Sequence, residues 1–144
     1  MGKAATPELP KQHRRVLIVE GDPDVRETIL ATLKKAGYAI AEAASSEEAV
    51  LLLGQDRLPS AICAIVCDIR APKIKGIEAV IYFRVRYPFI PVIVTATYPD
   101  IEWAITLMKR GVTDYLVKPV SKSDLILILK NAAYRYATMT RGSL

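Results

Sequence analysis

Three acidic residues and one lysine stand just after short apolar runs of this sequence. Carboxylates are the usual ligands of hard cations, and Mg²⁺ commonly takes one or two of them from a protein. A lysine opposite such a cluster supplies a point charge that suits a phosphoryl group. The combination indicates metal or phosphoryl chemistry, provided that folding brings the residues together. They are Glu20, Asp22, Asp68 and Lys118.

Each of these residues also has an ordinary structural explanation. Asp22 precedes a proline and is a good helix N-cap, Glu20 is explained as a solvated charge, and Lys118 as an ion-pair partner of Asp68. Asp68 is harder to explain in this way, because a carboxylate that ends a run as apolar as 61–67 needs a partner or a purpose. Their clustering favours a functional site.

Five apolar runs alternate with five helical patterns along the chain. The runs are short and nearly uninterrupted, as in strands that are buried on both faces of a parallel sheet. Five such units with short connections predict one α/β domain, a flavodoxin-like doubly wound sheet with strand order 2-1-3-4-5 and five helices. We expect strands at 16–19, 38–43, 61–67, 91–95 and 115–117, and helices at about 23–36, 46–53, 77–86, 100–110 and 122–134.

In such a sheet the site lies beyond the carboxyl ends of the strands, where the first and third strands meet. This rule selects a short set of residues, which includes the four named above. The others are Gly21 after the first strand, and Ala96 and Thr97 after the fourth.

Composition limits the classes of function. The chain has 144 residues, and its apolar runs are far shorter than the ~20 residues of a membrane span. No apolar segment precedes residue 16, so we expect a cytoplasmic protein without a membrane partner. The net charge of +5 lies in residues 1–15 and 135–144, whereas 16–134 is neutral. We therefore expect no direct nucleic-acid binding.

The two cysteines, Cys63 and Cys67, lie four residues apart within the third run. Strand alternation predicts that both point to the same face. With no other cysteine or histidine nearby, we expect buried reduced thiols and no metal site.

Four motifs in this order resemble those of CheY-like receiver domains of two-component response regulators. The resemblance spans about residues 14–134, which leaves 1–13 as a flexible N-terminal segment and 135–144 as a C-terminal tail or the start of a linker. The motifs are VLIVEGDP at 16–23, VCDIRAP at 66–72 with Gly76, PVIVTA at 91–96 and DYLVKP at 114–119.

The resemblance implies that Asp68 accepts a phosphoryl group from a sensor histidine kinase or a phosphotransfer protein. It further implies that Glu20, Asp68 and the backbone carbonyl of Arg70 bind Mg²⁺. Lys118 then contacts the phosphoryl oxygens, and its bond to Pro119 is cis. Such a domain is a signalling module and no enzyme beyond the phosphoryl transfer onto its own aspartate.

Two positions depart from the family pattern. Gly21 stands where receivers carry a second acid, so we expect weak Mg²⁺ binding, to which Asp22 is a possible contributor. Ala96 stands in place of the switch threonine or serine, and Thr97 is a substitute only if the strand has already ended. Strand alternation points Thr95 to the other face from Ala96.

The resemblance also implies roles around this centre. Tyr115 is the aromatic residue that changes rotamer on activation, and Arg70 and Tyr98 screen the acyl phosphate from water, which predicts slow dephosphorylation. The signal leaves through the helix at 100–110, the strand at 115–117 and the last helix. This face, with Trp103, Leu107 and Tyr115, is also the candidate homodimer surface.

Other functions fit the residues less well. A pseudo-receiver, which binds a protein partner without using phosphate, is favoured by Gly21 and Ala96 and opposed by Asp68, Lys118 and Glu20. A phosphatase with an aspartyl nucleophile needs a second acid at position 70, which is arginine. A flavin or nucleotide site needs a phosphate-binding loop after the first strand, and the acids there repel phosphate.

Overall fold

The computed structural model describes residues 15–55, 58–69 and 73–142. Five parallel strands form one sheet in the order β2-β1-β3-β4-β5, which confirms the predicted topology. The strands are β1 (Arg15–Val19), β2 (Ala39–Ala43), β3 (Ile62–Ile69), β4 (Val92–Ala96) and β5 (Asp114–Val117). The helices are α1 (Pro23–Lys35), α2 (Ser46–Leu53), α3 (Leu58–Ala61), α4 (Lys73–Arg86), α5 (Ile101–Lys109) and α6 (Lys122–Gly142).

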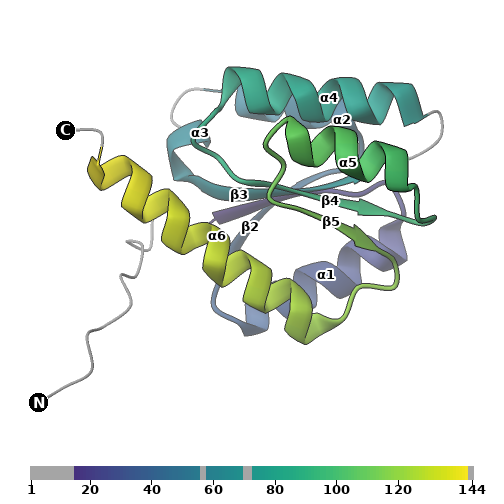
Figure 1. The fold of residues 1–144 in the computed structure, drawn as a ribbon. Coiled ribbons are helices and arrows are strands. Elements are labelled where there is room, and N and C mark those ends of the chain that lie inside the picture. The colour runs from purple at the N-terminus through teal and green to yellow at the C-terminus, as the bar shows by residue number, and fades with distance from the viewer. Residues whose placement is uncertain (1–14, 56–57, 70–72, 143–144) are drawn as a thin grey trace, which may run out of the picture.

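Helices cover both faces of the sheet (Figure 1), with α1 and α6 on one face and α2, α4 and α5 on the other. Each face has its own apolar core. Leu33 and Leu129 are buried on the first face, and Phe83 and Leu107 on the second. The central strand β3 is buried along its whole length, as a continuous apolar run predicts. Among the described residues, no helix is long and apolar enough to cross a membrane.

Local capping explains where several helices begin and end. Asp22 caps α1, Ser45 caps α2 and Asp100 caps α5, each by accepting a hydrogen bond from a backbone N–H of the first turn. Gly37 and Gly111 follow the ends of α1 and α5 with φ of 94° and 91°, a backbone conformation that glycine adopts without strain. These signals are local, and the structure confirms the element boundaries that rest on them.

Three features differ from the sequence-based expectation. The helix α4 begins at Lys73 and so includes Gly76, whereas the helix was expected to begin at about residue 77. A Cβ at Gly76 would lie 3.3 Å from the Cα of Ile69, so the glycine lets α4 approach the end of β3 closely, and packing overrides its low helix propensity. The helix α6 continues to Gly142, and the four-residue helix α3 was not expected.

The prediction that Cys63 and Cys67 share a face is wrong. Both thiols are free and buried, but Cys63 packs on the α1 and α6 face and Cys67 on the opposite face. The register explains the difference, because Arg15 pairs with Ile62 whereas the next residue, Val16, pairs with Ala64. The extra residue in β3 is a bulge, and it reverses the alternation of side chains at that point.

Candidate functional site

The side chain of Lys118 lies between two buried carboxylates. Its Nζ is 2.5 Å from Glu20 Oε1 and 2.7 Å from Asp68 Oδ1. The Glu20 and Asp68 side chains are 1% and 3% exposed, and that of Lys118 is 15% exposed. The structure thus brings together three of the four residues that the sequence selected.

The three residues come from the carboxyl ends of three strands, as the rule for doubly wound sheets requires. Glu20 directly follows β1, Asp68 is the penultimate residue of β3, and Lys118 directly follows β5. The backbone N–H of Lys118 donates to the Ala96 carbonyl at 2.8 Å, and the Lys118–Pro119 peptide bond is cis. Residues far apart in sequence therefore meet because the sheet aligns their strand ends.

The carboxylates decide the charge state of Lys118. Burial by itself lowers the pKa of a lysine, because it penalises the charged ammonium. The hydrogen bonds and negative charges of Asp68 and Glu20 outweigh burial and raise the pKa of Lys118 above 10.5. The lysine is therefore a permanent cation at neutral pH.

The thiol of Cys67 lies on the other face of the sheet and is affected by the same two carboxylates. Burial, followed by the negative charges of Asp68 and Glu20, raises the pKa of its thiol to about 12. A thiol that stays protonated is neither a nucleophile nor a metal ligand. Cys67 therefore belongs to the core and not to the site.

Asp22 acts as the N-cap of α1. Its Oδ1 accepts hydrogen bonds from the backbone N–H groups of Asp24 at 2.9 Å and Val25 at 3.3 Å. Its own N–H donates to Glu20 Oε2 at 3.2 Å. The Asp22 carboxylate is thus occupied at the helix terminus, whereas the Glu20 carboxylate turns inward.

Sequence reasoning did not single out Arg26. Its Nη1 donates to the Glu20 carbonyl at 2.7 Å, and its Nε lies 3.5 Å from Glu42 Oε1. Arg26 therefore ties the segment after β1 to α1 and to the end of β2. In the sequence, an arginine one turn after a helix N-cap looks like an ordinary charged surface residue. The sequence therefore did not predict this contact.

The described side chains that could bind a Mg²⁺ ion at this site are those of Glu20 and Asp68. Glu20 and Asp68 offer two carboxylates, which is within the number that Mg²⁺ usually takes from protein. Both already contact Lys118, Gly21 has no side chain to add, and Asp22 is occupied by capping. Over the described ranges, no group of three or more His, Cys, Asp or Glu residues is placed to bind a metal, and the Arg70 carbonyl lies outside those ranges.

The register of β4 places Thr95 and Ala96 on opposite faces of the sheet. Thr95 pairs with Asp68, whereas Ala96 pairs with Ile69 and with Val117. Side chains in paired positions of a parallel sheet share a face, so Thr95 shares that of Asp68 and Ala96 the opposite one. Tyr115, two residues before Val117, lies half-buried on the Ala96 face. The alternation of side chains along a strand predicted that Thr95 and Ala96 lie on opposite faces of the sheet. Only the register of β3 and β4 shows that Thr95 lies on the same face as Asp68.

The remaining predicted residues lie around this centre. Thr97 follows the end of β4 and is exposed, and the Tyr98 side chain is 71% exposed. Of the residues expected on a dimer surface, Leu107 is fully buried in the core, so it is not available to a partner. The exposed apolar side chains near it are instead Ile101, Ile105, Met108 and Val117.

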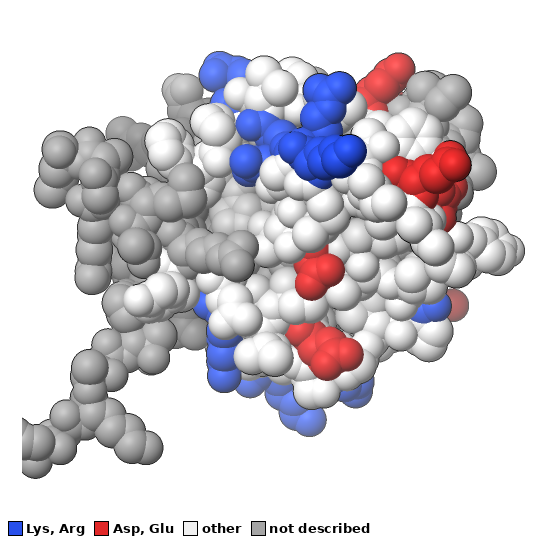
Figure 2. Space-filling view, viewed as in Figure 1, with Lys and Arg blue, Asp and Glu red and all other residues white. Residues whose placement is uncertain are grey.

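Charged side chains near that surface are segregated by sign. Figure 2 shows blue side chains gathered over α5 and red ones set apart from them. Basic residues occupy the last turns of α4 and α5, with Arg84, Arg86 and Lys109, whereas Glu102 lies in the first turn of α5.

Comparison with known proteins agrees with this geometry. Residues 16–130 match the response regulator receiver domain family. The chain is 33% identical over 119 residues to a putative NtrX-like response regulator of Rickettsia bellii and 31% identical over 119 residues to the response regulator protein FleR of Pseudomonas aeruginosa. These matches cover 81% and 82% of this chain but 24% of each relative, so the chain spans about a quarter of the length of these curated relatives.

A solved structure shows the same fold. The receiver domain of a response regulator from Clostridium thermocellum superposes with a TM-score of 0.79 at 26% identity, over 87% of this chain and 98% of that one. The match of sequence, topology and strand-end residues leads to one conclusion. The chain belongs to the response regulator receiver domain family of two-component signal transduction.

Proposed function

We propose that Asp68 is the phosphoacceptor of this receiver domain. The observation that supports it is the position of Lys118 Nζ, 2.7 Å from Asp68 Oδ1 and 2.5 Å from Glu20 Oε1. An ammonium placed on the acceptor carboxylate neutralises the phosphoryl oxygens as they arrive, which is the main task of a protein in phosphoryl transfer.

The step has a simple balance of bonds. A carboxylate oxygen of Asp68 attacks phosphorus, and the bond from phosphorus to the donor breaks. If the donor is a phosphohistidine, the imidazole leaves and takes up a proton; if it is acetyl phosphate, acetate leaves. Lys118 keeps its proton throughout, because the raised pKa makes it an electrostatic partner and not an acid.

Mg²⁺ is the cofactor that the family implies. Glu20 and Asp68 would bind it, and the ion would supply further neutralisation of the phosphoryl oxygens. We propose that its affinity is low because Gly21 adds no carboxylate. The variant Gly21→Asp restores an acid there, and we expect it to raise Mg²⁺ affinity by roughly tenfold or more in a calorimetric titration. Equal affinities in the two proteins would contradict this explanation.

The acceptor is tested with acetyl phosphate and Mg²⁺, followed by intact-mass measurement. We expect the wild-type protein to gain one phosphoryl group and Asp68→Asn to gain none. Asp24→Asn is the matched control, because Asp24 is an exposed acid on α1, and it should behave as the wild type. A gain that persists in Asp68→Asn would place the acceptor elsewhere.

A wild-type protein that takes no phosphoryl group and binds no Mg²⁺ at millimolar concentration would favour the pseudo-receiver. The buried carboxylates and their lysine oppose that alternative, since an interaction module does not need them.

The partners follow from the family and stay proposals for this chain. We propose a sensor histidine kinase or a phosphotransfer protein as donor. The output and homodimer surface would be formed by α5, β5 and α6, where Ile101, Ile105 and Met108 are exposed. Light scattering before and after phosphorylation tests the dimer, and Ile105→Glu should abolish any mass increase. A mass increase that persists in Ile105→Glu would place the contact on another surface.

Two further proposals concern the lifetime of the phosphorylated form and the location and contacts of the domain. We propose slow dephosphorylation, with Arg70 and Tyr98 limiting access of water; a half-life of seconds would contradict it. We also propose a cytoplasmic domain that makes no direct contact with nucleic acid, since basic and acidic side chains balance over 16–134.

A further inference from the structure

The helix α4 presents an apolar stripe on the side that faces away from the sheet. Tyr82 and Val85 lie three residues apart and are 40% and 76% exposed, and Phe89, just after the helix, is 50% exposed. Ile77 and Val80 on the inner side are buried, so the core of the domain is complete without the stripe. Exposed apolar side chains that gather on one face mark a site of contact with another molecule.

The helix α4 is the middle helix of its layer. α2 packs against β1 and β2, α4 against β3 and β4, and α5 against β5, so α4 has a helix on either side (Figure 1). Its outer stripe therefore lies at the centre of this face of the domain. On the neighbouring α2, Leu51 is exposed as well. This face is distinct from the α5, β5 and α6 surface that is proposed for output.

Contacts within the domain hold the outer side chains of α4 in place. The rings of Tyr82 and Tyr87 meet edge to face with their centroids 6.4 Å apart, and the guanidinium carbon of Arg86 lies 5.6 Å from the centre of the Tyr87 ring. The Tyr87 hydroxyl donates to the Leu53 carbonyl of α2 at 3.1 Å. Side chains that are fixed in advance lose less conformational entropy when a partner covers them.

The charges on this side of α4 are placed symmetrically about Tyr82. Glu78 lies four residues before Tyr82 and Arg86 four residues after it, and both are exposed. Residues four apart are neighbours on one side of a helix, and at about 1.5 Å per residue each charge lies about 6 Å from the tyrosine along the helix axis. Two copies of α4 that cross antiparallel at Tyr82 bring Glu78 of each copy opposite Arg86 of the other. A two-fold contact needs such self-complementarity.

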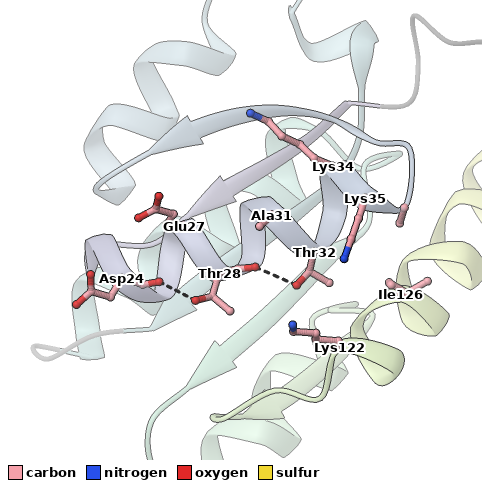
Figure 3. A pocket seen from close by; sticks show the side chains of 10 residues that line it. Asp24, Glu27, Thr28, Ala31, Thr32, Lys34, Lys35, Lys122 and Ile126 are labelled. Carbon is pink, nitrogen blue, oxygen red and sulfur yellow. Dashed lines mark hydrogen bonds between the residues drawn. The ribbon is translucent and has the colours of Figure 1, made fainter.

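The groove on the opposite face, between α1 and α6, has a different character (Figure 3). Charged side chains line much of it, among them Glu27, Lys34 and Lys35. The hydroxyls of Thr28 and Thr32 donate to carbonyls of their own helix at 3.0 Å and 2.9 Å. Covering these charges would cost free energy. An apolar contact between two copies is therefore favoured on the α4 face.

We propose that the outer face of α4 binds a second copy of this chain, antiparallel about Tyr82 and without any need for phosphorylation. Tyr82 and Val85 form the apolar centre of the contact, and the two pairs of Glu78 with Arg86 form its ends. The symmetry of the charges favours a second copy over an unrelated protein, which would not match acid and base in this order. The contact does not rest on the proposed function of Asp68, so either can fail without the other.

The test measures the mass of the unphosphorylated protein by light scattering as its concentration is raised. We expect the wild type to pass from monomer to dimer, and Val85→Glu to raise the dissociation constant by about tenfold or more, because it places a charge at the centre of the contact. Ala31→Glu adds the same charge at an exposed position of α1, in the groove of Figure 3, and should leave the dimer unchanged. Ile105→Glu on α5 should leave it unchanged too. Circular dichroism and thermal unfolding establish that each variant is folded.

Reversal of the charges tests the antiparallel arrangement. Glu78→Arg and Arg86→Glu each place like charges opposite one another, and we expect each to raise the dissociation constant by about fivefold or more. The double variant restores opposite charges and should return to within about twofold of the wild type. A double variant that dimerises no better than the single ones overturns the antiparallel pairing.

Two other results overturn the proposal as a whole. One is a wild-type protein that stays monomeric at concentrations up to about 1 mM. The other is a dimer that survives Val85→Glu or that Ile105→Glu disrupts, since the contact would then lie on another face. Neither result bears on whether Asp68 accepts a phosphoryl group.

Discussion

Lys118 and Glu20 lie 98 residues apart in the chain, and their side chains form a contact of 2.5 Å beside Asp68. The site is therefore a triad with two negative charges and one positive charge, enclosed by the ends of three strands. Its stability depends on the lysine, because neither carboxylate has much exposure to water.

Lys118→Met removes the cation and leaves two buried carboxylates side by side. We expect the free energy of unfolding at pH 7 to fall by about 3–5 kcal/mol, the cost of removing one partner from a buried ion pair. Urea unfolding at pH 7 measures the loss.

Lys122→Met is the control, because Lys122 is exposed on the first turn of α6 and its replacement should cost less than about 0.5 kcal/mol. Equal losses in the two variants would contradict the role of the triad. The pKa of Lys118 is raised in the folded state, so its stabilisation is complete below pH 10.5 and is lost only as the pH rises through the higher folded value.

Variants of Asp22 distinguish its structural role as the N-cap of α1 from a role in binding Mg²⁺. Asp22→Ala removes the N-cap of α1 and should lower the free energy of unfolding by about 1 kcal/mol, whereas Asp22→Asn retains a capping oxygen and should cost little. Neither variant should change Mg²⁺ affinity in a calorimetric titration. A loss of affinity in both would mean that the carboxylate leaves the helix terminus to bind the ion.

The raised pKa of the Cys67 thiol predicts how the free energy of unfolding changes at alkaline pH. The pKa of the thiol is 9.0 in an unfolded chain and about 12 in the folded one, so above pH 9 the unfolded state releases a proton that the folded state keeps. The free energy of unfolding therefore falls with rising pH, by about 1.4 kcal/mol per pH unit from this group. Cys67→Ala lacks this contribution.

The measurement is the difference in unfolding free energy between wild type and Cys67→Ala from pH 8 to pH 11. We expect a constant difference below pH 9 and a shift in favour of the variant above it. A difference that stays constant over the whole range would show that the thiol ionises equally in both states.

Replacement of Gly111 tests whether the backbone at the end of α5 requires a glycine. Its φ is +91°, and an added Cβ would lie 3.0 Å from Arg84 Nη2, so Gly111→Ala should cost about 1–2 kcal/mol. Gly54 ends α2 with φ −76° and meets no atom closer than 3.4 Å, so Gly54→Ala should be neutral or stabilise by about 0.5 kcal/mol. Thermal unfolding of the pair measures the contrast; similar melting temperatures would contradict it.

The parts of the structure that the sequence predicted are those with local causes. Asp22 marks the start of α1 because a capping oxygen acts within three residues. The alternation of strands and helices predicted a parallel sheet with helices on both faces, and the order 2-1-3-4-5 is the common doubly wound order that suits five strands. The placement of Glu20, Asp68 and Lys118 at one edge then followed from the parallel sheet.

The parts that the sequence did not predict depend on packing between distant elements. The start of α4 before Gly76 depends on the approach of that glycine to Ile69. The separation of Cys63 from Cys67 depends on a bulge that pairing with β1 creates. The relation of Thr95 to Asp68 depends on the register of β3 and β4, which no single strand encodes.

The sheet topology has a consequence for motion. β5 is an edge strand that pairs with β4 alone, and its four residues are half-buried or exposed, whereas β3 is buried throughout. Edge strands open locally at a lower free energy than central ones. We expect amide hydrogens of 115–117 to exchange with solvent faster than those of 64–67. Slower exchange at 115–117 would contradict this. Because Lys118 directly follows β5, we expect each opening of this strand to withdraw the lysine from Glu20 and Asp68.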